Sequence, residues 1–404
     1  MPKIYFDYAA TTPIDPRVAK EMASYVKGKF GNTMSLHSFG QEAKFVLEKS
    51  REKVAAVIKA KPNEIIFTGS ATESNNLALK GIAFAAFSNA MVGQENQRSR
   101  EFPTDHLGKK KHIIISQIEH PCVAESVDWL EKHGFEITRL PVDKYGLVNY
   151  LDIEKAIKQE TILVSTIHGS NEIGTIQPIE EIGKICREKN VYFHTDASQC
   201  LGKIPIDVNK MNIDLLTASS HKIYGPKGAA LLFIRNGVKI EPILHGGGQE
   251  RGLRSSTINL AAIVGFAKAC EICDKEMKKE AERLEKLRNI LIKEVITIKE
   301  SYLNGHPEKR LPNIINFRFS FIEGESLAIQ LDLKGVAVST GSACSSIKLE
   351  PSPILLAIGL SPQEAHGSLR ISLGRWTTKK EIDYLLEVLP GIVENLRKIS
   401  PFKG

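Results

Sequence analysis

The chain has 404 residues, a formal charge of +7 and 42% hydrophobic residues, a profile typical of a globular protein large enough for two domains. Its lysines are spread along the chain rather than gathered in one region, so the charge does not favour nucleic-acid binding. We find no apolar run long enough to cross a bilayer and no apolar signal segment at the start. These features predict a cytoplasmic protein with no membrane partner.

Predicted strands and helices alternate through the first part of the chain, after an extended arm at residues 1–14. The predicted helices cover residues 15–26, 39–60, 73–87, 122–133, 151–159 and 179–189. The predicted strands cover residues 64–68, 112–116, 135–140, 161–168, 191–196, 213–218 and 229–234. This alternation predicts a mainly parallel sheet with helices on both faces, and the polar segment 88–111 predicts a surface loop.

The pattern changes at about residue 256, where a long region rich in lysine and glutamate predicts a helix that runs to about residue 300. The predicted elements that follow are a strand at 314–319, a helix at 326–333, a strand at 369–373 and a helix at 379–398. We therefore predict an α/β fold with a large domain of residues 15–257. A smaller α+β domain would combine residues 1–14 and 258–404.

The six cysteines are scattered, which argues against a disulfide framework. Cys270 and Cys273 form a CxxC pair inside the long helical pattern, and we interpret them as helix packing because no second pair accompanies them. Cys344 differs from the others because its neighbours at residues 339–346 are small or polar, unlike those of a core cysteine. We predict no stable metal site, although Cys344 could bind an iron–sulfur cluster transiently.

Lys222 lies between the two apolar runs at residues 213–218 and 229–234. Loops between parallel strands are where α/β enzymes place their chemistry, although an isolated lysine on a loop is ordinarily a surface residue. Two serines and a histidine at positions 219–221 add donors suited to a phosphate. A lysine that forms a Schiff base with pyridoxal phosphate (PLP) needs such neighbours, so this segment predicts a PLP site.

Three other predicted strands also end in polar residues. Asp196 could pair with a pyridinium nitrogen or simply cap a helix, and His120 could stack on a flat ring or belong to an ordinary turn. Asn171 follows a third strand. The strand ends would bring these side chains and Lys222 to one edge of one sheet, and their shared placement supports a common site.

A turn of small hydroxyl residues at 69–74 links a predicted strand to a predicted helix. The free N–H groups and the dipole at such a helix start attract phosphate. The alternative is simple capping of the helix by Thr72. No GxGxxG segment occupies a strand–helix turn, so a dinucleotide site has little support.

These segments resemble those of the cysteine desulfurases of the NifS/IscS type, which belong to the class V aminotransferases among PLP-dependent enzymes of fold type I. In chain order, the matching segments are YFDYAATT (5–12), SLHSFG (35–40), ATESNN (71–76), EH (119–120), NEIGT (171–175), DASQ (196–199), SHKIYGPKG (220–228), GGGQERGLRSST (246–257), GSACSS (341–346) and AHGSLR (365–370). The resemblance covers nearly the whole chain and is highly specific.

The resemblance implies how the cofactor would be held. Lys222 would bind PLP covalently, Asp196 would pair with its pyridine nitrogen, His120 would stack on its ring and Gln199 would contact its ring oxygen. The residues implied for the phosphate site are Ala71, Thr72, Ser219, Ser220 and His221. Thr257 would reach the phosphate of the other subunit, which implies a homodimer.

The resemblance also implies the reaction. Asn171 and Arg370 would hold the carboxylate of L-cysteine, and the Lys222 amine would remove its Cα proton. Cys344, on a mobile loop, would take the sulfur as a persulfide and pass it to an iron–sulfur scaffold protein. The alternatives are a selenocysteine lyase, an aminotransferase, which the Cys344 segment disfavours, and a non-catalytic scaffold, which the presence of Lys222 and Cys344 disfavours.

Overall fold

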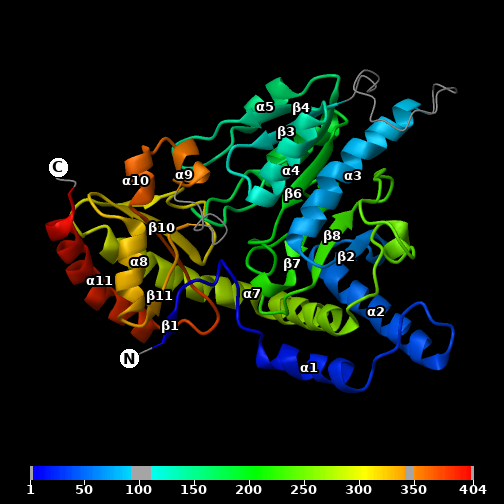
Figure 1. Cartoon of the computed structure of the whole chain (residues 1–404), viewed down its shortest axis with the longest axis horizontal. Coiled ribbons are helices and arrows are strands. Elements are labelled where there is room, and N and C mark those ends of the chain that lie inside the picture. The colour runs from blue at the N-terminus through cyan, green and yellow to red at the C-terminus, as the bar shows by residue number, and fades with distance from the viewer. Residues whose placement is uncertain (1–2, 92–110, 342–349, 402–404) are drawn as a thin grey trace.

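The computed structural model describes residues 3–91, 111–341 and 350–401. Cys344 and most of the loop predicted at residues 88–111 lie outside the described residues. A seven-stranded sheet forms the centre of the larger part of the chain (Figure 1). Its strands, in spatial order, are β2 (Ile65–Thr68), β8 (Ala230–Ile234), β7 (Leu215–Ser219), β6 (Tyr192–Asp196), β5 (Thr161–Ser165), β3 (His112–Ser116) and β4 (Glu136–Leu140).

The sheet is mainly parallel, as predicted, because β4, β3, β5, β6 and β7 all run in one direction. One expectation is wrong: the strands that flank Lys222 are antiparallel, since β8 runs against both β7 and β2. The reason is the length of the connection. Only residues 220–229 separate β7 from β8, and a crossover between parallel strands needs a dozen residues or more.

Helices cover both faces of this sheet (Figure 1). The helices are α1 (Pro16–Lys27), α2 (Ser38–Val57), α3 (Ala71–Met91), α4 (Pro121–Lys132), α5 (Tyr150–Ala156), α6 (Ile179–Glu188) and α7 (Leu260–Val295). Side chains alternate between the faces along each strand. In β2, Ile65 and Phe67 share a core with α1, α2, α6 and α7, whereas Ile66 shares a core with α3 and α4. No helix in the described part of the chain is long and apolar enough to cross a membrane.

A second, smaller sheet lies beside the first (Figure 1). Its strands are antiparallel, in the order β12 (Ser368–Ser372), β10 (Ile314–Phe319) and β9 (Ser301–Asn304). A parallel pair joins β1 (Ile4–Tyr5) to β11 (Val336–Ala337). The helices of this part are α8 (Gly324–Asp332), α9 (Pro353–Ala357), α10 (Pro362–His366) and α11 (Lys379–Ile399). β9, β11, α9 and α10 are short elements that the sequence pattern did not predict.

Helix α7 connects the two cores. Its first turns, including Cys270 and Cys273, pack in the core of the large sheet, in agreement with the helix-packing interpretation of these cysteines. Its last turns, from Leu284 to Val295, pack with the small sheet, where the arm residue Phe6 also lies. The start of α7 at Leu260 is close to the predicted domain boundary at residue 257, but the helix itself contributes to both cores.

Candidate active site

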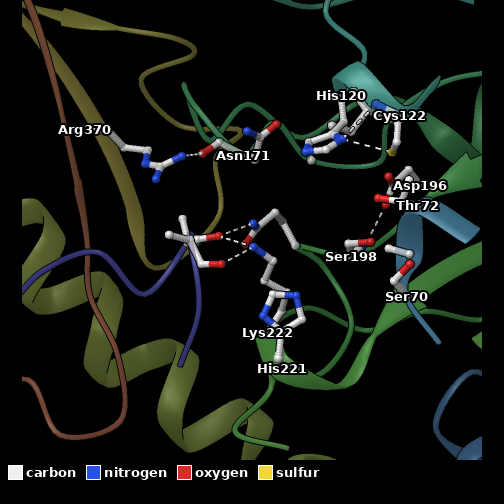
Figure 2. A pocket seen from close by; sticks show the side chains of 16 residues that line it. Ser70, Thr72, His120, Cys122, Asn171, Asp196, Ser198, His221, Lys222 and Arg370 are labelled. Atoms are coloured by element: carbon white, nitrogen blue, oxygen red, sulfur yellow. Dashed lines mark hydrogen bonds between the residues drawn. The ribbon is translucent and has the colours of Figure 1, made fainter. Parts of the chain in front are cut away.

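A cavity of about 230 Å³ lies where β3, β5, β6 and β7 end (Figure 2). Its lining residues are Ala9, Ala10, Ser70, Ala71, Thr72, His120, Cys122, Ile167, Gly169, Asn171, Asp196, Ser198, Gln199, His221, Lys222 and Arg370. The four side chains predicted from the strand ends, His120, Asn171, Asp196 and Lys222, are therefore brought together. Arg370 reaches the same cavity from β12 of the small sheet.

Lys222 ends a 3₁₀ turn, Ser220–Lys222, that follows directly after β7. Its amine donates hydrogen bonds to the backbone oxygens of Ala9, at 2.6 Å, and Ala10, at 2.7 Å. Burial, together with the nearby cations of Lys203 and Arg370, lowers the pKa of this amine to about 7. A substantial fraction of the amine is therefore neutral near pH 7, as a nucleophile or a base requires.

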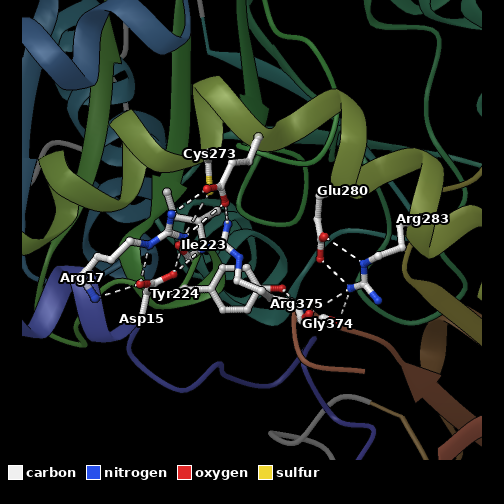
Figure 3. A network of polar contacts seen from close by, with 10 residues as sticks. Asp15, Arg17, Ile223, Tyr224, Cys273, Glu280, Arg283, Gly374 and Arg375 are labelled. Carbon is white, nitrogen blue, oxygen red and sulfur yellow. Dashed lines mark hydrogen bonds and ion pairs between the residues drawn. The ribbon is translucent and has the colours of Figure 1, made fainter. Parts of the chain in front are cut away.

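The turn that carries Lys222 makes contacts with the N-terminal arm and with Arg375, which follows β12. Thr12 of the arm donates its hydroxyl to the backbone oxygen of His221 at 2.9 Å and accepts the N–H of Tyr224 at 2.9 Å. Tyr224 has a left-handed backbone, with φ of 66°, which is unfavourable for a bulky residue. Its hydroxyl accepts the N–H of Arg375 at 2.8 Å, and the Arg375 guanidinium covers its ring and pairs with Asp15 (Figure 3). These contacts fix the direction in which Lys222 points.

Asp196 is the last residue of β6 and is buried beside the cavity. One carboxylate oxygen accepts a hydrogen bond from the side-chain amide of Asn75, on α3, at 2.7 Å. The other accepts the backbone N–H of Ser198 at 2.9 Å. A buried carboxylate held by neutral donors favours a cationic ligand, and a protonated pyridine nitrogen is a suitable one.

The start of α3 forms one wall of the cavity through Ser70, Ala71 and Thr72. The structure corrects the capping alternative, because the hydroxyl of Ser70, and not that of Thr72, accepts the N–H of Glu73 at 3.1 Å. His221 faces the same cavity, and burial lowers the pKa of its imidazole to about 4. Free N–H groups at the start of a 21-residue helix, with hydroxyl and imidazole groups nearby, are suited to an anion such as phosphate.

His120 caps the start of α4, where its Nδ1 accepts the backbone N–H of Cys122 at 3.2 Å. The thiol of Cys122 lies 2.9 Å from the same nitrogen, and both side chains line the cavity (Figure 2). Cys122 received no role from the sequence pattern. The available signal was its position two residues after His120, in the first turn of a helix that follows a strand.

Arg370 is almost fully buried, with 1% of its surface exposed. Its guanidinium donates to the carboxylate of Asp7 at 2.7 Å and to the backbone oxygen of Asn171 at 2.9 Å. Its Nε has no hydrogen-bond partner although it is buried. Asp7 belongs to the arm and received no role from the sequence. It stabilises a charge that would otherwise be costly to bury.

Gln199 lies at the cavity, where its amide nitrogen donates to the backbone oxygen of Ala9 at 2.9 Å and its amide oxygen accepts from Lys203 at 3.1 Å. Three other predicted site residues, all described in the structure, do not line the cavity. Ser219 and Ser220 are buried because the end of β7 and the turn after it direct them into the interior, and Thr257 is exposed. Their contacts with phosphate stay predictions, as does the role of Cys344.

Several buried polar atoms around the cavity lack a hydrogen-bond partner. Among the described residues they include Asn75 Oδ1, Asn171 Oδ1, Ser198 Oγ and Arg370 Nε. Such groups destabilise a protein unless a ligand or water satisfies them. The donor set fits PLP, which offers an aldehyde to the Lys222 amine, a pyridine nitrogen to Asp196 and a phosphate to the start of α3. The fold and the site together define a PLP-dependent enzyme of fold type I.

Comparisons with known proteins identify the family of this chain. Residues 4–385 match the aminotransferase class-V family. The chain is 50% identical over 402 residues to the cysteine desulfurase IscS of Dictyoglomus turgidum, a match that covers 99% of this chain and 97% of that protein. The chain belongs to the class-V aminotransferase family and, within it, to the cysteine desulfurases.

Solved structures agree with this assignment. A NifS-like protein, 38% identical, superposes with a TM-score of 0.87 over 98% of this chain and 100% of its own. SspA in complex with cysteine, 35% identical, superposes with a TM-score of 0.79 over 93% of this chain and 100% of its own. The predicted fold class is thus confirmed.

Proposed function

We propose that this protein takes sulfur from L-cysteine with the help of PLP, releases L-alanine and carries the sulfur as a persulfide on Cys344. One observation supports this proposal above the others. The amine of Lys222, the carboxylate of Asp196 and the guanidinium of Arg370 line a single cavity, and burial lowers the pKa of that amine to about 7. The related SspA structure holds cysteine, which supports cysteine as the substrate.

In this proposal, Lys222 would bind the aldehyde of PLP, Asp196 would pair with its ring nitrogen and His120 would stack on its ring. Ser70, Ala71 and Thr72 at the start of α3, together with His221, hold its phosphate. Bound PLP supplies an electron sink for the pair of electrons left on the substrate when its Cα proton is removed. Asp196 strengthens that sink because its charge stabilises a protonated ring nitrogen.

Arg370 and Asn171 orient the substrate by its carboxylate. A guanidinium fork binds a carboxylate through two parallel hydrogen bonds, and the unpartnered Nε of Arg370 is one donor for this purpose. Asp7 and the backbone oxygen of Asn171 already hold the other guanidinium nitrogens in place. The arginine therefore loses little conformational freedom when the substrate binds.

Lys222 moves the proton. With the substrate bound, the Lys222 amine would accept the Cα proton, and a pKa of about 7 keeps it competent at neutral pH. The backbone oxygens of Ala9 and Ala10, 2.6 and 2.7 Å from the amine, keep the freed amine beside the cavity.

Cys344 receives the sulfur. Its thiolate attacks the substrate sulfur, so that an S–S bond forms as the Cβ–S bond breaks. The electron pair of the broken bond remains on Cβ, which takes up a proton, and Lys222 would return a proton to Cα, so that alanine is the product. The persulfide then passes its terminal sulfur to an acceptor, which we propose to be an iron–sulfur scaffold protein.

We also propose that the protein is a homodimer in which Thr257 contacts the cofactor phosphate of the partner subunit. Thr257 is exposed, lies at the end of the glycine-rich segment 246–257 and does not line its own cavity. In the proposed division into a large domain, residues 15–257, and a small domain, residues 1–14 and 258–404, Lys222 belongs to the large domain and Arg370 to the small domain.

The direct test is to incubate the PLP-loaded protein with L-cysteine and a thiol reductant, and to measure alanine and sulfide. The proposal expects equal amounts of both, without any keto acid. Lys222→Ala should abolish turnover, whereas Lys227→Ala, which changes an exposed lysine five residues away, should not. Turnover that survives Lys222→Ala, or amino transfer that requires a keto acid, would overturn the proposal.

A further inference from the structure

Cys122 connects two side chains of the site that belong to different elements. Its sulfur lies 2.9 Å from Nδ1 of His120 and 3.0 Å from the side-chain amide nitrogen of Asn75. That amide nitrogen also donates to the carboxylate of Asp196 at 2.7 Å. A continuous hydrogen-bonded chain therefore runs from Asp196 on β6, through Asn75 on α3 and Cys122 on α4, to His120 (Figure 2 shows its His120 end).

The direction of each hydrogen bond in this chain follows from its neighbours. Nδ1 of His120 also accepts the backbone N–H of Cys122 at 3.2 Å, so this nitrogen carries no proton in the neutral ring. The Cys122 thiol must then donate to Nδ1. Because the sulfur accepts one amide proton of Asn75 while the other amide proton goes to Asp196, the thiol is polarised as a better donor.

Cys122 is well suited to stay protonated. Burial raises the pKa of its thiol to about 12, and the carboxylates of Asp196 and Glu119 also oppose its ionisation. Glu119 is itself buried, and burial raises its pKa to about 8. Burial lowers the pKa of the His120 imidazole, and the Lys222 cation lowers it too, whereas the charge of Asp196 opposes this shift. The surroundings therefore favour a neutral thiol beside a neutral imidazole.

We propose that Cys122 is a positioning residue that holds His120 in the tautomer with its proton on Nε2 and couples it to Asp196 through Asn75. The nitrogen that carries the proton is then Nε2, because Nδ1 is the ring nitrogen in contact with Cys122. The catalytic consequence rests on the proposed function, because it concerns a histidine that stacks on PLP. The tautomer itself depends only on contacts within the protein.

The proposed role gives the thiols of Cys122 and Cys344 different chemistry. Cys344 must ionise to receive sulfur, whereas Cys122 must keep its proton to donate it. Cys122 is accordingly not a sulfur acceptor, although it lines the cavity in which the substrate would bind.

Two substitutions distinguish a donor from a packing residue. A buried cysteine that only fills space behaves as a small apolar group, so Cys122→Ala would then be tolerated better than Cys122→Ser. If Cys122 acts as a hydrogen-bond donor, Cys122→Ser should instead be tolerated better than Cys122→Ala. We expect Cys122→Ala to lower kcat about threefold to tenfold, the range for one intramolecular hydrogen bond, and Cys122→Ser to lose less. Cys186→Ala, which changes a buried thiol in the core of the large sheet, serves as the control and should leave kcat unchanged.

The second readout does not depend on turnover. In the full-length protein with ¹⁵N-labelled histidine, the signal lost in His120→Gln identifies His120. We expect an unprotonated Nδ1, a protonated Nε2, and a higher His120 pKa in Cys122→Ala, because loss of a donor to the neutral ring favours protonation. A protonated Nδ1, an unchanged pKa in Cys122→Ala, or an alanine variant more active than the serine variant would overturn the inference. If the wild-type protein released no sulfide but showed this tautomer, only the proposed function would fail.

Discussion

The amine of Lys222 lies 2.6 Å from the backbone oxygen of Ala9, although 213 residues separate them in the sequence. This contact brings the N-terminal arm, which is anchored in the small sheet by Ile4 and Phe6, against the lysine turn of the large sheet. The arm therefore contacts the lysine amine through main-chain oxygen atoms, without the use of a side chain.

The pKa of Lys222 predicts how PLP-free protein captures PLP. The neutral amine reacts, and with a pKa of about 7 its neutral fraction rises about tenfold from pH 6 to pH 8 and then levels off. An ordinary lysine, with a pKa near 10.4, would continue to gain about tenfold per pH unit up to pH 10. Absorbance of the protein-bound PLP, measured at a series of pH values, checks this prediction. PLP capture that keeps increasing up to pH 10 would contradict a lysine pKa of about 7.

Arg370→Lys should weaken cysteine binding, because a lysine cannot form the two parallel hydrogen bonds of a guanidinium. We expect kcat/KM to fall about tenfold to a hundredfold, mainly through a higher KM, since hydrogen bonds to charged groups contribute about 1.5–3 kcal/mol each. Steady-state kinetics on cysteine measure the change. Arg318→Lys, on the neighbouring strand β10, is the matched control, and an equal loss in both variants would argue against a role in the site.

Arg51 and Glu250 form a buried ion pair that fastens the glycine-rich segment to β2. Arg51 donates to both carboxylate oxygens, at 2.7 and 2.8 Å, and Glu250 also accepts the N–H of Phe67 at 2.7 Å. Glu250→Gln should lower the free energy of unfolding by up to about 3–5 kcal/mol, because it removes the buried counter-charge and leaves the guanidinium only its pair with the half-exposed Glu48. Urea unfolding measures this effect.

The control for this prediction is an exposed ion pair on the same helix. Lys49 and Glu52 are each about half exposed, at 54% and 49%, and Glu52→Gln should cost no more than about 1 kcal/mol. Similar losses in Glu250→Gln and Glu52→Gln would show that the buried pair contributes no more than a surface pair.

Cys344 should gain one sulfur atom when the enzyme meets cysteine under non-reducing conditions. Peptide mass spectrometry after a short incubation with ³⁴S-labelled cysteine locates the added atom. We expect it on the peptide that contains Cys344 and not on that of Cys122, whose thiol burial keeps protonated. Labelling mainly at Cys122 would contradict both assignments.

The parts of the site that follow a strand could be predicted from the sequence. His120, Asn171, Asp196 and Lys222 each come soon after an apolar run, and in a parallel sheet such positions converge on one edge. Most strand boundaries were accurate for the same reason, since buried strands are continuous apolar runs; β10 is at Ile314–Phe319 as predicted, whereas the strand predicted at 161–168 ends at Ser165.

The parts that depend on distant contacts could not be predicted in this way. Neither the carbonyl oxygens of Ala9 and Ala10 nor the pairing of Asp7 with Arg370 leaves a local pattern, because the partners lie more than two hundred residues apart. The inward direction of Ser220 depends on a 3₁₀ turn, which has no distinctive spacing over three residues.

The most direct test of the central claim is to identify the lysine that binds PLP. Lys222 has a rival in Lys203, another buried amine near the cavity, whose pKa burial lowers to about 8. Borohydride reduction of the PLP-loaded protein, followed by peptide mass spectrometry, makes the attachment permanent and locates it. The account predicts a phosphopyridoxyl group on Lys222 and an unmodified Lys203, and its attachment to Lys203 or to a surface lysine would contradict it.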